Sequence, residues 1–423
     1  MSPRVDLERL LPWIMGVVVV LVWVGPLQWV SGSVDQISDL AVYEETYRHM
    51  AAGSLPYRDF SLEYPPLAAA LFWFAGVLPA SYSTAFSFLM MLCLVLTVVP
   101  VTLTARALGL SPARQAVAGL ITACIPLLLG GLVETRFDLL AAALIAWIFW
   151  AVVTDRMTVA WVLLGIAVLV KLVPLAFIPV LAIIHARRHG TPAVWRGSLT
   201  GLAVVVLVAA PLALLAPSGV WDSVSYHLDR PLQIESTGAA YLMGMRLLAG
   251  IPLSVHTSFG SQGLQGGAPD LIALISTIAL VVLVLAIALT VLRLLAVQPS
   301  SAIPAIAISG IAATATALLV AGKVLSPQFL VWIVPAAVLI VGRRGWATVI
   351  ITAVALLLTQ AYFPTDYWQV VALQDPQMGL VVARDVALIV LLALVWPRRT
   401  PKDPLRPRAS GQAREPAREN LRP

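Results

Sequence analysis

The chain has 423 residues, of which 60% are hydrophobic and only 11% are charged. This composition excludes a soluble globular protein and predicts an all-α protein that crosses a membrane many times. The formal net charge of +6 does not indicate nucleic-acid binding, because most of it comes from Arg residues in short loops and in the C-terminal tail.

Apolar segments define the predicted topology. The segment 67–80 is shorter than the roughly 17–25 residues of a full span, and prolines flank it, so we interpret it as a helix lying at the membrane surface. The other apolar segments give about twelve predicted transmembrane helices: 10–30, 84–105, 115–131, 138–154, 158–170, 173–186, 197–217, 271–295, 301–321, 327–342, 345–361 and 380–397.

The distribution of Arg residues orients these helices. The positive-inside rule makes the Arg-rich side cytoplasmic, which places both termini inside the cell (plasma) membrane and the acidic loops outside. Residues 1–397 then form one transmembrane domain, and the Pro- and Arg-rich segment 398–423 is predicted to be a disordered basic cytoplasmic tail. The Arg residues on the cytoplasmic side are Arg106, Arg114, Arg156, Arg187, Arg188, Arg196, Arg293, Arg343, Arg344, Arg398 and Arg399.

The first outer loop, 31–83, is the most polar part of the domain. A helix is predicted to start at Leu40 and to end at Gly53. Together with the predicted surface helix 67–80, it makes a pair of helices in this loop. Asp39 stands in N-cap position, where capping is the alternative to a catalytic role. The acids of the loop, opposed by Arg48 and Arg58, are Asp35, Asp39, Glu44, Glu45, Asp59 and Glu63.

Two of the three lysines of the chain, Lys171 and Lys323, lie inside apolar stretches. A cation at membrane depth costs about 2.5–3.5 kcal/mol on insertion scales, so it indicates an anion or a polar cavity nearby, unless the side chain snorkels to the interface. The segment 158–186 around Lys171 is either a short helical hairpin with Lys171 at its outer tip or a broken helix in which Lys171 lines a cavity.

Several motifs of the outer side resemble a known family. Asp39-Leu-Ala-Val-Tyr43, Gly53, Pro56-Tyr57 and Glu63-Tyr64-Pro65-Pro66 look like the first outer loop of the GT-C integral-membrane glycosyltransferases, in particular the actinobacterial polyprenyl-phosphate-mannose-dependent α-mannosyltransferases. The motifs that follow in the family's order are Arg136-Phe-Asp138, Lys171-Leu-Val-Pro174, Arg230 to Ser236, and Lys323 to Gln328.

The resemblance implies an inverting transfer of mannose from a polyprenyl-phosphate donor to a lipid-linked or cell-envelope glycan. Asp39 would be the general base, and a second acid could be Asp35, Glu44 or Asp59. The resemblance further implies donor-phosphate binding by Lys323, Lys171, Arg136, Arg230 and His227, and substrate binding by Tyr43, Asp59, Glu63, Tyr64, Glu235 and Gln328.

Other readings of these residues stay open. Arg136 and Asp138 could instead neutralise one another, and the Gly- and Ser-containing stretch after Ser258 reads as a flexible outer loop. A polyprenyl-phosphate arabinofuranose-dependent transferase uses similar chemistry, and a transporter or lipid flippase is the alternative from another class. No cofactor is expected from a His or Cys cluster, although outer carboxylates could hold a divalent cation. The expected partners are the lipid-linked donor, a glycolipid or polysaccharide acceptor and membrane lipids, and no nucleic acid.

Overall fold

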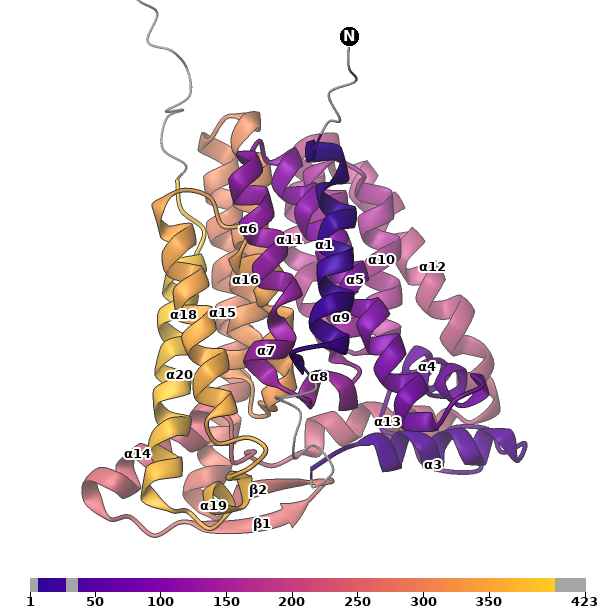
Figure 1. The fold of residues 1–423 in the computed structure, drawn as a ribbon, viewed down its shortest axis with the longest axis vertical. Helices are drawn as coiled ribbons and strands as arrows, with labels where there is room; N and C mark the ends of the chain where they lie inside the picture. The colour runs from indigo at the N-terminus through magenta and orange to yellow at the C-terminus, as the bar shows by residue number, and fades with distance from the viewer. Residues whose placement is uncertain (1–6, 28–36, 400–423) are drawn as a thin grey trace, which may run out of the picture.

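A computed structural model describes residues 7–27 and 37–399, which are almost entirely helical. Most long helices run side by side along the vertical axis of Figure 1. Helix α1 (Leu7–Val24) begins at the upper end, and α20 (Asp375–Val395) ends there. Short helices and a β-hairpin cover the lower end. Asp35 and residues 400–423 of the predicted tail lie outside the described residues.

The first half of the chain supplies the right-hand part of the bundle in Figure 1. A proline inside a helix does not end it here: α5 continues past Pro100 to Ala107. After α1, the elements are α3 (Leu40–Ala51), α4 (Pro66–Val77), α5 (Tyr82–Ala107), α6 (Pro112–Ala123), α7 (Ile125–Leu129), α8 (Leu132–Thr135), α9 (Asp138–Val153), α10 (Met157–Val170), η2 (Val173–Phe177), α11 (Ile178–His189) and α12 (Thr191–Leu215).

The second half begins with short helices and a β-hairpin at the lower end and then returns to the bundle. Its elements are α13 (Pro217–Asp229), α14 (Thr237–Ala249), β1 (Ser254–Ser258), β2 (Ser261–Gln265), α15 (Gly267–Val297), η3 (Ser300–Ala302), α16 (Ile303–Ala321), η4 (Pro327–Trp332), α17 (Val334–Ala337), α18 (Arg343–Gln360), α19 (Tyr367–Val371) and α20.

The helices confirm a multi-pass membrane protein. Helices α12 and α15 expose rows of Leu and Val along most of their length, as expected of helices that face lipid. The predicted number of about twelve crossings is not settled by helix length, because several apolar helices are shorter than a full span. By length and composition alone, the candidate spans within the described residues are Tyr82–Ala107, Thr191–Leu215, Gly267–Val297, Ser300–Ala321 and Asp375–Val395.

The segment around Lys171 forms a helical hairpin. Asp155, just before α10, makes ion pairs with Arg188 at 3.0 Å and with His189 at 2.9 Å, near the end of α11. The start of α10 therefore lies beside the end of α11, so the chain reverses between them. Lys171 stands at this reversal, in an extended conformation directly after α10.

The described part of the loop between α1 and α5 contains two short helices, α3 and α4, where two helices were predicted. Gly53 follows α3 with a positive φ of 90°, as expected for a glycine that ends a helix. Tyr57 also has a positive φ, 69°, and its carbonyl oxygen would be 1.9 Å from a Cβ placed on Gly219 of α13. The loop thus touches α13 backbone to backbone, with no room for a side chain between them.

The stretch after Ser258 is a β-hairpin, so the prediction of a flexible loop there was wrong. Strands β1 and β2 pair antiparallel, with Ser254 opposite Gln265 and Ser258 opposite Ser261. Phe259 and Gly260 form the two-residue turn, and both have positive φ. The hairpin is also tied to the preceding segment, because Ile234 N donates to Gln262 O at 3.0 Å and Leu264 N donates to Leu232 O at 2.9 Å.

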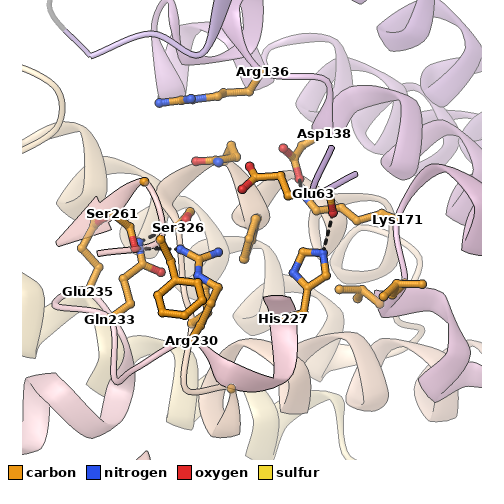
Figure 2. Close-up of a pocket in the computed structure, with 18 of the residues that line it drawn as sticks. Glu63, Arg136, Asp138, Lys171, His227, Arg230, Gln233, Glu235, Ser261 and Ser326 are labelled. Carbon is orange, nitrogen blue, oxygen red and sulfur yellow. Dashed lines mark hydrogen bonds and ion pairs between the residues drawn. The ribbon is translucent and has the colours of Figure 1, made fainter. Parts of the chain in front are cut away.

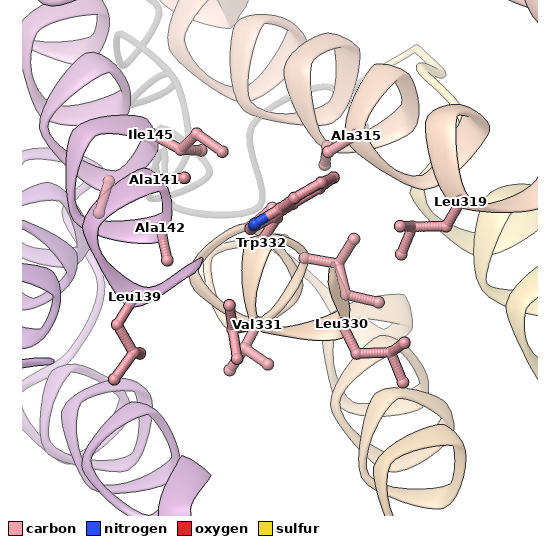
Figure 3. Packing of buried hydrophobic residues seen from close by; sticks show 14 of the residues in the cluster. Leu139, Ala141, Ala142, Ile145, Ala315, Leu319, Leu330, Val331 and Trp332 are labelled. Carbon is pink, nitrogen blue, oxygen red and sulfur yellow. The ribbon is translucent and has the colours of Figure 1, made fainter. Parts of the chain in front are cut away.

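Short η4 sits in the middle of the core. Trp332, which is 2% exposed, lies between α9 and α16 (Figure 3). The facing positions on these helices include Ala141, Ala142 and Ala315, whose small side chains leave space for the indole ring. This packing fixes η4, and with it the segment from Lys323 to Ser326 that leads into it.

Candidate active site

A cavity of about 790 Å³ lies among the elements of the lower end of the bundle. Segments that are far apart in the sequence meet there: the first outer loop, the start of α9, the tip of the α10–α11 hairpin, the end of α13 and the segment after α16 (Figure 2). Asp59 and Glu44, two of the candidate second acids, do not line it. The predicted site residues that do are Asp39, Tyr43, Glu63, Tyr64, Arg136, Lys171, His227, Arg230, Glu235, Lys323 and Gln328.

Asp39 faces the cavity and does not cap α3. Its side chain makes no capping hydrogen bond, and the amide of Leu40 is instead bonded by Ser38 Oγ at 3.1 Å. The Asp39 carboxylate forms an ion pair with Arg136, and Tyr43 OH donates to Oδ2 at 3.2 Å. With 34% of its side chain exposed, Asp39 is oriented by these partners and still open to the cavity.

Arg136 holds the first outer loop against α9. Besides the ion pair with Asp39, its Nη2 donates to Ile37 O at 3.2 Å, and its side chain is only 8% exposed. The predicted alternative pair between Arg136 and Asp138 does not form. Because its charge is already matched by Asp39, Arg136 fits the role of orienting the carboxylate better than the predicted role of binding a phosphate.

Lys171 is also already paired. Its Nζ donates to Asp138 Oδ1 at 2.6 Å, and it lies 5.0, 4.4 and 4.9 Å from the ring centroids of Phe137, Phe329 and Trp332. A carboxylate and three ring faces account for the positive charge at this depth. The predicted phosphate-binding role of Lys171 therefore has little support in its contacts, although the residue does line the cavity.

Lys323 and Arg230 are the cations left for an anion. Lys323 Nζ donates to Leu228 O at 2.5 Å, and Arg230 Nη2 donates to Ser261 Oγ at 2.9 Å. Within residues 7–27 and 37–399, no carboxylate lies within ion-pair distance of either side chain. Burial lowers the pKa of Lys323. The negative charge of Asp229 opposes this shift, and the positive charge of Arg230 adds to it more weakly. An anion placed between them would relieve this repulsion.

His227 supplies a neutral ring. Its Nε2 donates to Glu63 O at 3.0 Å, since a carbonyl can only accept. Burial lowers the pKa of His227 below its ordinary 6.5, so the imidazole carries no charge at neutral pH. We therefore correct the expectation that His227 is one of the fixed cations: it offers Nδ1 as a hydrogen-bond acceptor instead.

Aromatic rings build the wall behind Asp39. Tyr43 is 1% exposed and stacks on Phe72 with centroids 4.3 Å apart, and Tyr64 meets it edge-on at 5.8 Å. Tyr57 OH donates to Tyr64 O at 2.6 Å, which fixes the chain just before α4. Tyr43 therefore acts on Asp39 through its hydroxyl, and little of its ring is left for a substrate.

Asp59 lies outside the cavity lining, against the prediction. It accepts from the amide of Leu55 at 2.7 Å and pairs with Arg58 through two contacts of 2.9 Å. The hydrogen bond from Arg58 and the bond from Leu55 lower the pKa of Asp59. These contacts fix the turn between α3 and α4, so Asp59 shapes the loop without lining the cavity.

Glu235 is a buried carboxyl on the cavity wall. Glu235 is only 1% exposed, and Tyr362 OH donates to its Oε1 at 2.9 Å. Burial raises the pKa of Glu235 to about 7, although the charges of Arg384 and Arg136 and the bond from Tyr362 act in the opposite direction.

This carboxyl predicts how stability depends on pH. The pKa of Glu235 is about 7 in the folded protein, and its ordinary value of 4.5 applies to the unfolded chain. The folded protein therefore binds this proton more tightly than the unfolded chain does. The resulting stabilisation is present below about pH 4.5 and is lost as the pH rises through about 7. We expect the Tm in detergent, followed by tryptophan fluorescence, to fall by a few degrees between about pH 5 and about pH 8. Glu235→Gln should lose a measurable part of this fall, and an unchanged slope in that variant would contradict the assignment.

Sequence reasoning missed two parts of the site. Gln233 lines the cavity, and its Nε2 donates to Ser326 Oγ at 3.2 Å. Arg384 and Asp385 lie behind Glu235 on α20, and a search for charges inside the apolar run 380–397 would have found them. Among the described residues, no group of three or more His, Cys, Asp or Glu side chains is placed to hold a metal ion.

Comparison with known proteins finds one matching family and one curated relative. The sequence model described as Glycosyltransferase family 87 matches residues 62–301. GPI mannosyltransferase 1 of Aspergillus oryzae (strain ATCC 42149 / RIB 40) is 30% identical over 145 residues, which are 33% of this chain and 34% of that protein. The chain thus matches about a third of the length of this curated relative.

Two solved structures are similar at 12% sequence identity. One is ArnT from Cupriavidus metallidurans bound to undecaprenyl phosphate, with a TM-score of 0.46 over 90% of this chain and 76% of that chain. The other is the Archaeoglobus fulgidus oligosaccharyltransferase tethered with an acceptor peptide containing the NVT sequon, with a TM-score of 0.45 over 94% of this chain and 56% of that chain.

Proposed function

The chain belongs to glycosyltransferase family 87, and from this premise we propose that it transfers mannose from a polyprenyl-phosphate donor to a lipid-linked or cell-envelope glycan. The observation that carries the proposal is the set of charges that line one cavity. Asp39 offers a carboxylate, and Lys323 and Arg230 offer cations that have no carboxylate within ion-pair distance among the described residues.

The reaction needs both the carboxylate and the cations. The acceptor hydroxyl oxygen forms a bond to the anomeric carbon while its proton passes to the Asp39 carboxylate. The bond between the anomeric carbon and the phosphate oxygen breaks, and the electron pair leaves with the polyprenyl phosphate. Attack and departure on opposite faces of the sugar invert the anomeric configuration, as a single displacement requires.

The fixed groups around the cavity suit this chemistry. Arg136 and Tyr43 orient the carboxylate, so it does not need to be reorganised when the proton moves. Lys323 and Arg230 stabilise the negative charge that grows on the leaving phosphate, and they are already in place before the reaction. A neutral His227 adds a polar contact beside them.

A GT-C architecture with about twelve crossings, of the actinobacterial mannosyltransferase group, is part of the proposal. The cavity would open on the extracytoplasmic side, and both termini would be cytoplasmic. In support, the Arg-bearing turns at the upper end of Figure 1 contact one another: Arg344 Nη1 donates to Trp396 O at 2.9 Å, and Arg187 Nε donates to Leu295 O at 3.0 Å.

Cysteine labelling tests this topology. Cysteines introduced at the exposed positions Glu45 and Gln265 should react with an impermeant thiol reagent added to intact cells, and cysteines at His189 and Arg343 should react only after permeabilisation. The wild-type chain gives the background from Cys93 and Cys124. Labelling of His189 from outside would invert the proposed orientation.

Purified protein tests the donor. We expect transfer of radiolabelled mannose from polyprenyl-phosphate mannose to a glycolipid acceptor, and no transfer from a nucleotide sugar. Activity with polyprenyl-phosphate arabinofuranose alone would replace mannose by a pentose within the same chemistry. A transporter or flippase is disfavoured by the family, and it would be indicated if the protein moved lipid across vesicles without any transfer.

A further inference from the structure

Helix α20 carries two charges deep inside the protein. Arg384 is 0% exposed and Asp385 is 2% exposed, in the middle of a helix whose other buried residues are mostly apolar. Their side chains form an ion pair of 3.3 Å. Such a pair is expensive to bury and often contributes little to stability, so its presence in a membrane-spanning helix indicates another task.

The pair is bonded to the segment that follows α13. Arg384 Nη2 donates to the carbonyl oxygen of Glu235 at 2.6 Å, and Thr237 Oγ1 donates to Asp385 Oδ1 at 2.9 Å. Tyr362, at the end of α18, adds a third tie through its bond to the Glu235 carboxyl. Residues 235–237 are therefore fixed from three sides by side chains of the bundle.

The same segment forms the wall that carries Lys323. The amide of Gln233 donates to the carbonyl oxygen of Lys323 at 2.9 Å, and the Gln233 side chain donates to Ser326. Ser236 links both parts, because its amide and its hydroxyl donate to Gln233 O, at 3.0 and 2.7 Å. A short chain of hydrogen bonds thus leads from Arg384 to the backbone of Lys323.

We propose that Arg384 and Asp385 are positioning residues of the donor site, which set the place of Lys323 and Gln233 through residues 233–237. The inference rests on the proposed function, because it takes Lys323 as a ligand of the donor phosphate. Neither Arg384 nor Asp385 lines the cavity itself, so their effect passes through the segment that includes the lining residues Gln233 and Glu235.

The geometry of Arg384 argues against a purely structural role. Its Nε and Nη1 find no hydrogen-bond acceptor within the described residues. The guanidinium therefore forms fewer hydrogen bonds than it could in this buried position. A pair of apolar residues of similar size would stabilise α20 at least as well. What only the charged pair supplies is the directed contact to Glu235 and Thr237.

Replacing the whole pair tests the proposal. The double variant Arg384→Met with Asp385→Leu removes both charges together and leaves neither buried without a partner. We expect it to keep the elution profile and Tm of wild type, to raise the KM for polyprenyl-phosphate mannose about tenfold and to change kcat less, since small displacements of binding groups cost one to two orders of magnitude. Hydrogen exchange of the peptide covering 231–240 should become faster without any substrate. The single variant Arg384→Lys, which keeps the positive charge beside Asp385, should have a donor KM between those of wild type and the double variant.

His185→Leu is the matched control. It removes a buried polar contact on α11, the bond that Trp161 Nε1 donates to Nδ1 at 3.0 Å, at a site that does not line the cavity. It should lower the Tm and leave the KM for the donor unchanged.

The outcomes separate the inference from the proposed function. A double variant with wild-type KM for the donor, or with wild-type exchange in 231–240, overturns the positioning role. If the wild-type protein uses no polyprenyl-phosphate sugar, the proposed function fails. The exchange experiment alone then decides whether the pair positions the segment.

Discussion

Asp39→Asn is expected to leave the protein folded and to lower the rate of sugar transfer by roughly 10²–10⁴-fold, the usual loss when a general base is removed. The amide keeps the shape of the side chain and can still accept from Tyr43 OH. It cannot take the proton of the acceptor hydroxyl. The effect should therefore appear in kcat, measured with saturating polyprenyl-phosphate mannose and glycolipid.

The ion pair with Arg136 makes a stability control necessary. Asn leaves the guanidinium of Arg136, a residue with 8% of its side chain exposed, without its anion, so the Tm of the variant must be measured beside its rate. Asp59→Asn is the matched control, because Asp59 belongs to the same loop, has an Arg partner and lies outside the cavity. If Asp39→Asn kept more than about a tenth of the activity, the base would have to be another residue.

Lys323→Met should lower kcat/KM roughly tenfold to hundredfold, which corresponds to about 1.4–2.8 kcal/mol in the interaction with the leaving phosphate. Methionine keeps the apolar stem and removes the charge. Lys323→Arg should retain much of the activity, since a cation at this place is the main requirement.

Arg246→Met is the control for Lys323. Arg246 lies on α14, also at the lower end of the bundle, but it does not line the cavity, so its loss should leave the donor KM unchanged. A fully active Lys323→Met enzyme would exclude the phosphate role of this lysine and leave Arg230 as the candidate. In that case the Tm of Lys323→Met should equal or exceed that of wild type, because the variant removes a cation whose burial is unfavourable.

Hydrophobic periodicity and length predicted most of the helices but not how their ends are built. The short span 327–342 is in fact the 3-10 helix η4 followed by the single turn α17. Pro335 has no N–H to continue the helical bonding from η4, and Trp332 packs into the space left by alanines of α9 and α16. Apolar composition alone cannot distinguish such a packed irregular passage from a regular helix.

The charged residues of the cavity lining were largely predictable because they lie in short motifs, whereas their pairing was not. Sequence proximity favoured a pair between Arg136 and Asp138, but the structure crosses the partners, joining Arg136 to Asp39 and Lys171 to Asp138. These contacts depend on how α9, the α10–α11 hairpin and the first outer loop are placed in space. The link from Arg384 to Glu235, 149 residues apart, was hidden for the same reason.

The contact between Tyr57 and Gly219 limits how this scaffold can be recombined. A chimera that takes its first outer loop from one relative and its α13 from another must join two backbones that touch without a side chain between them. Any residue other than glycine at 219 would push the loop away and shift Tyr64 and Asp39 with it. Loop and helix therefore form one transferable unit, although more than 150 residues of sequence separate them.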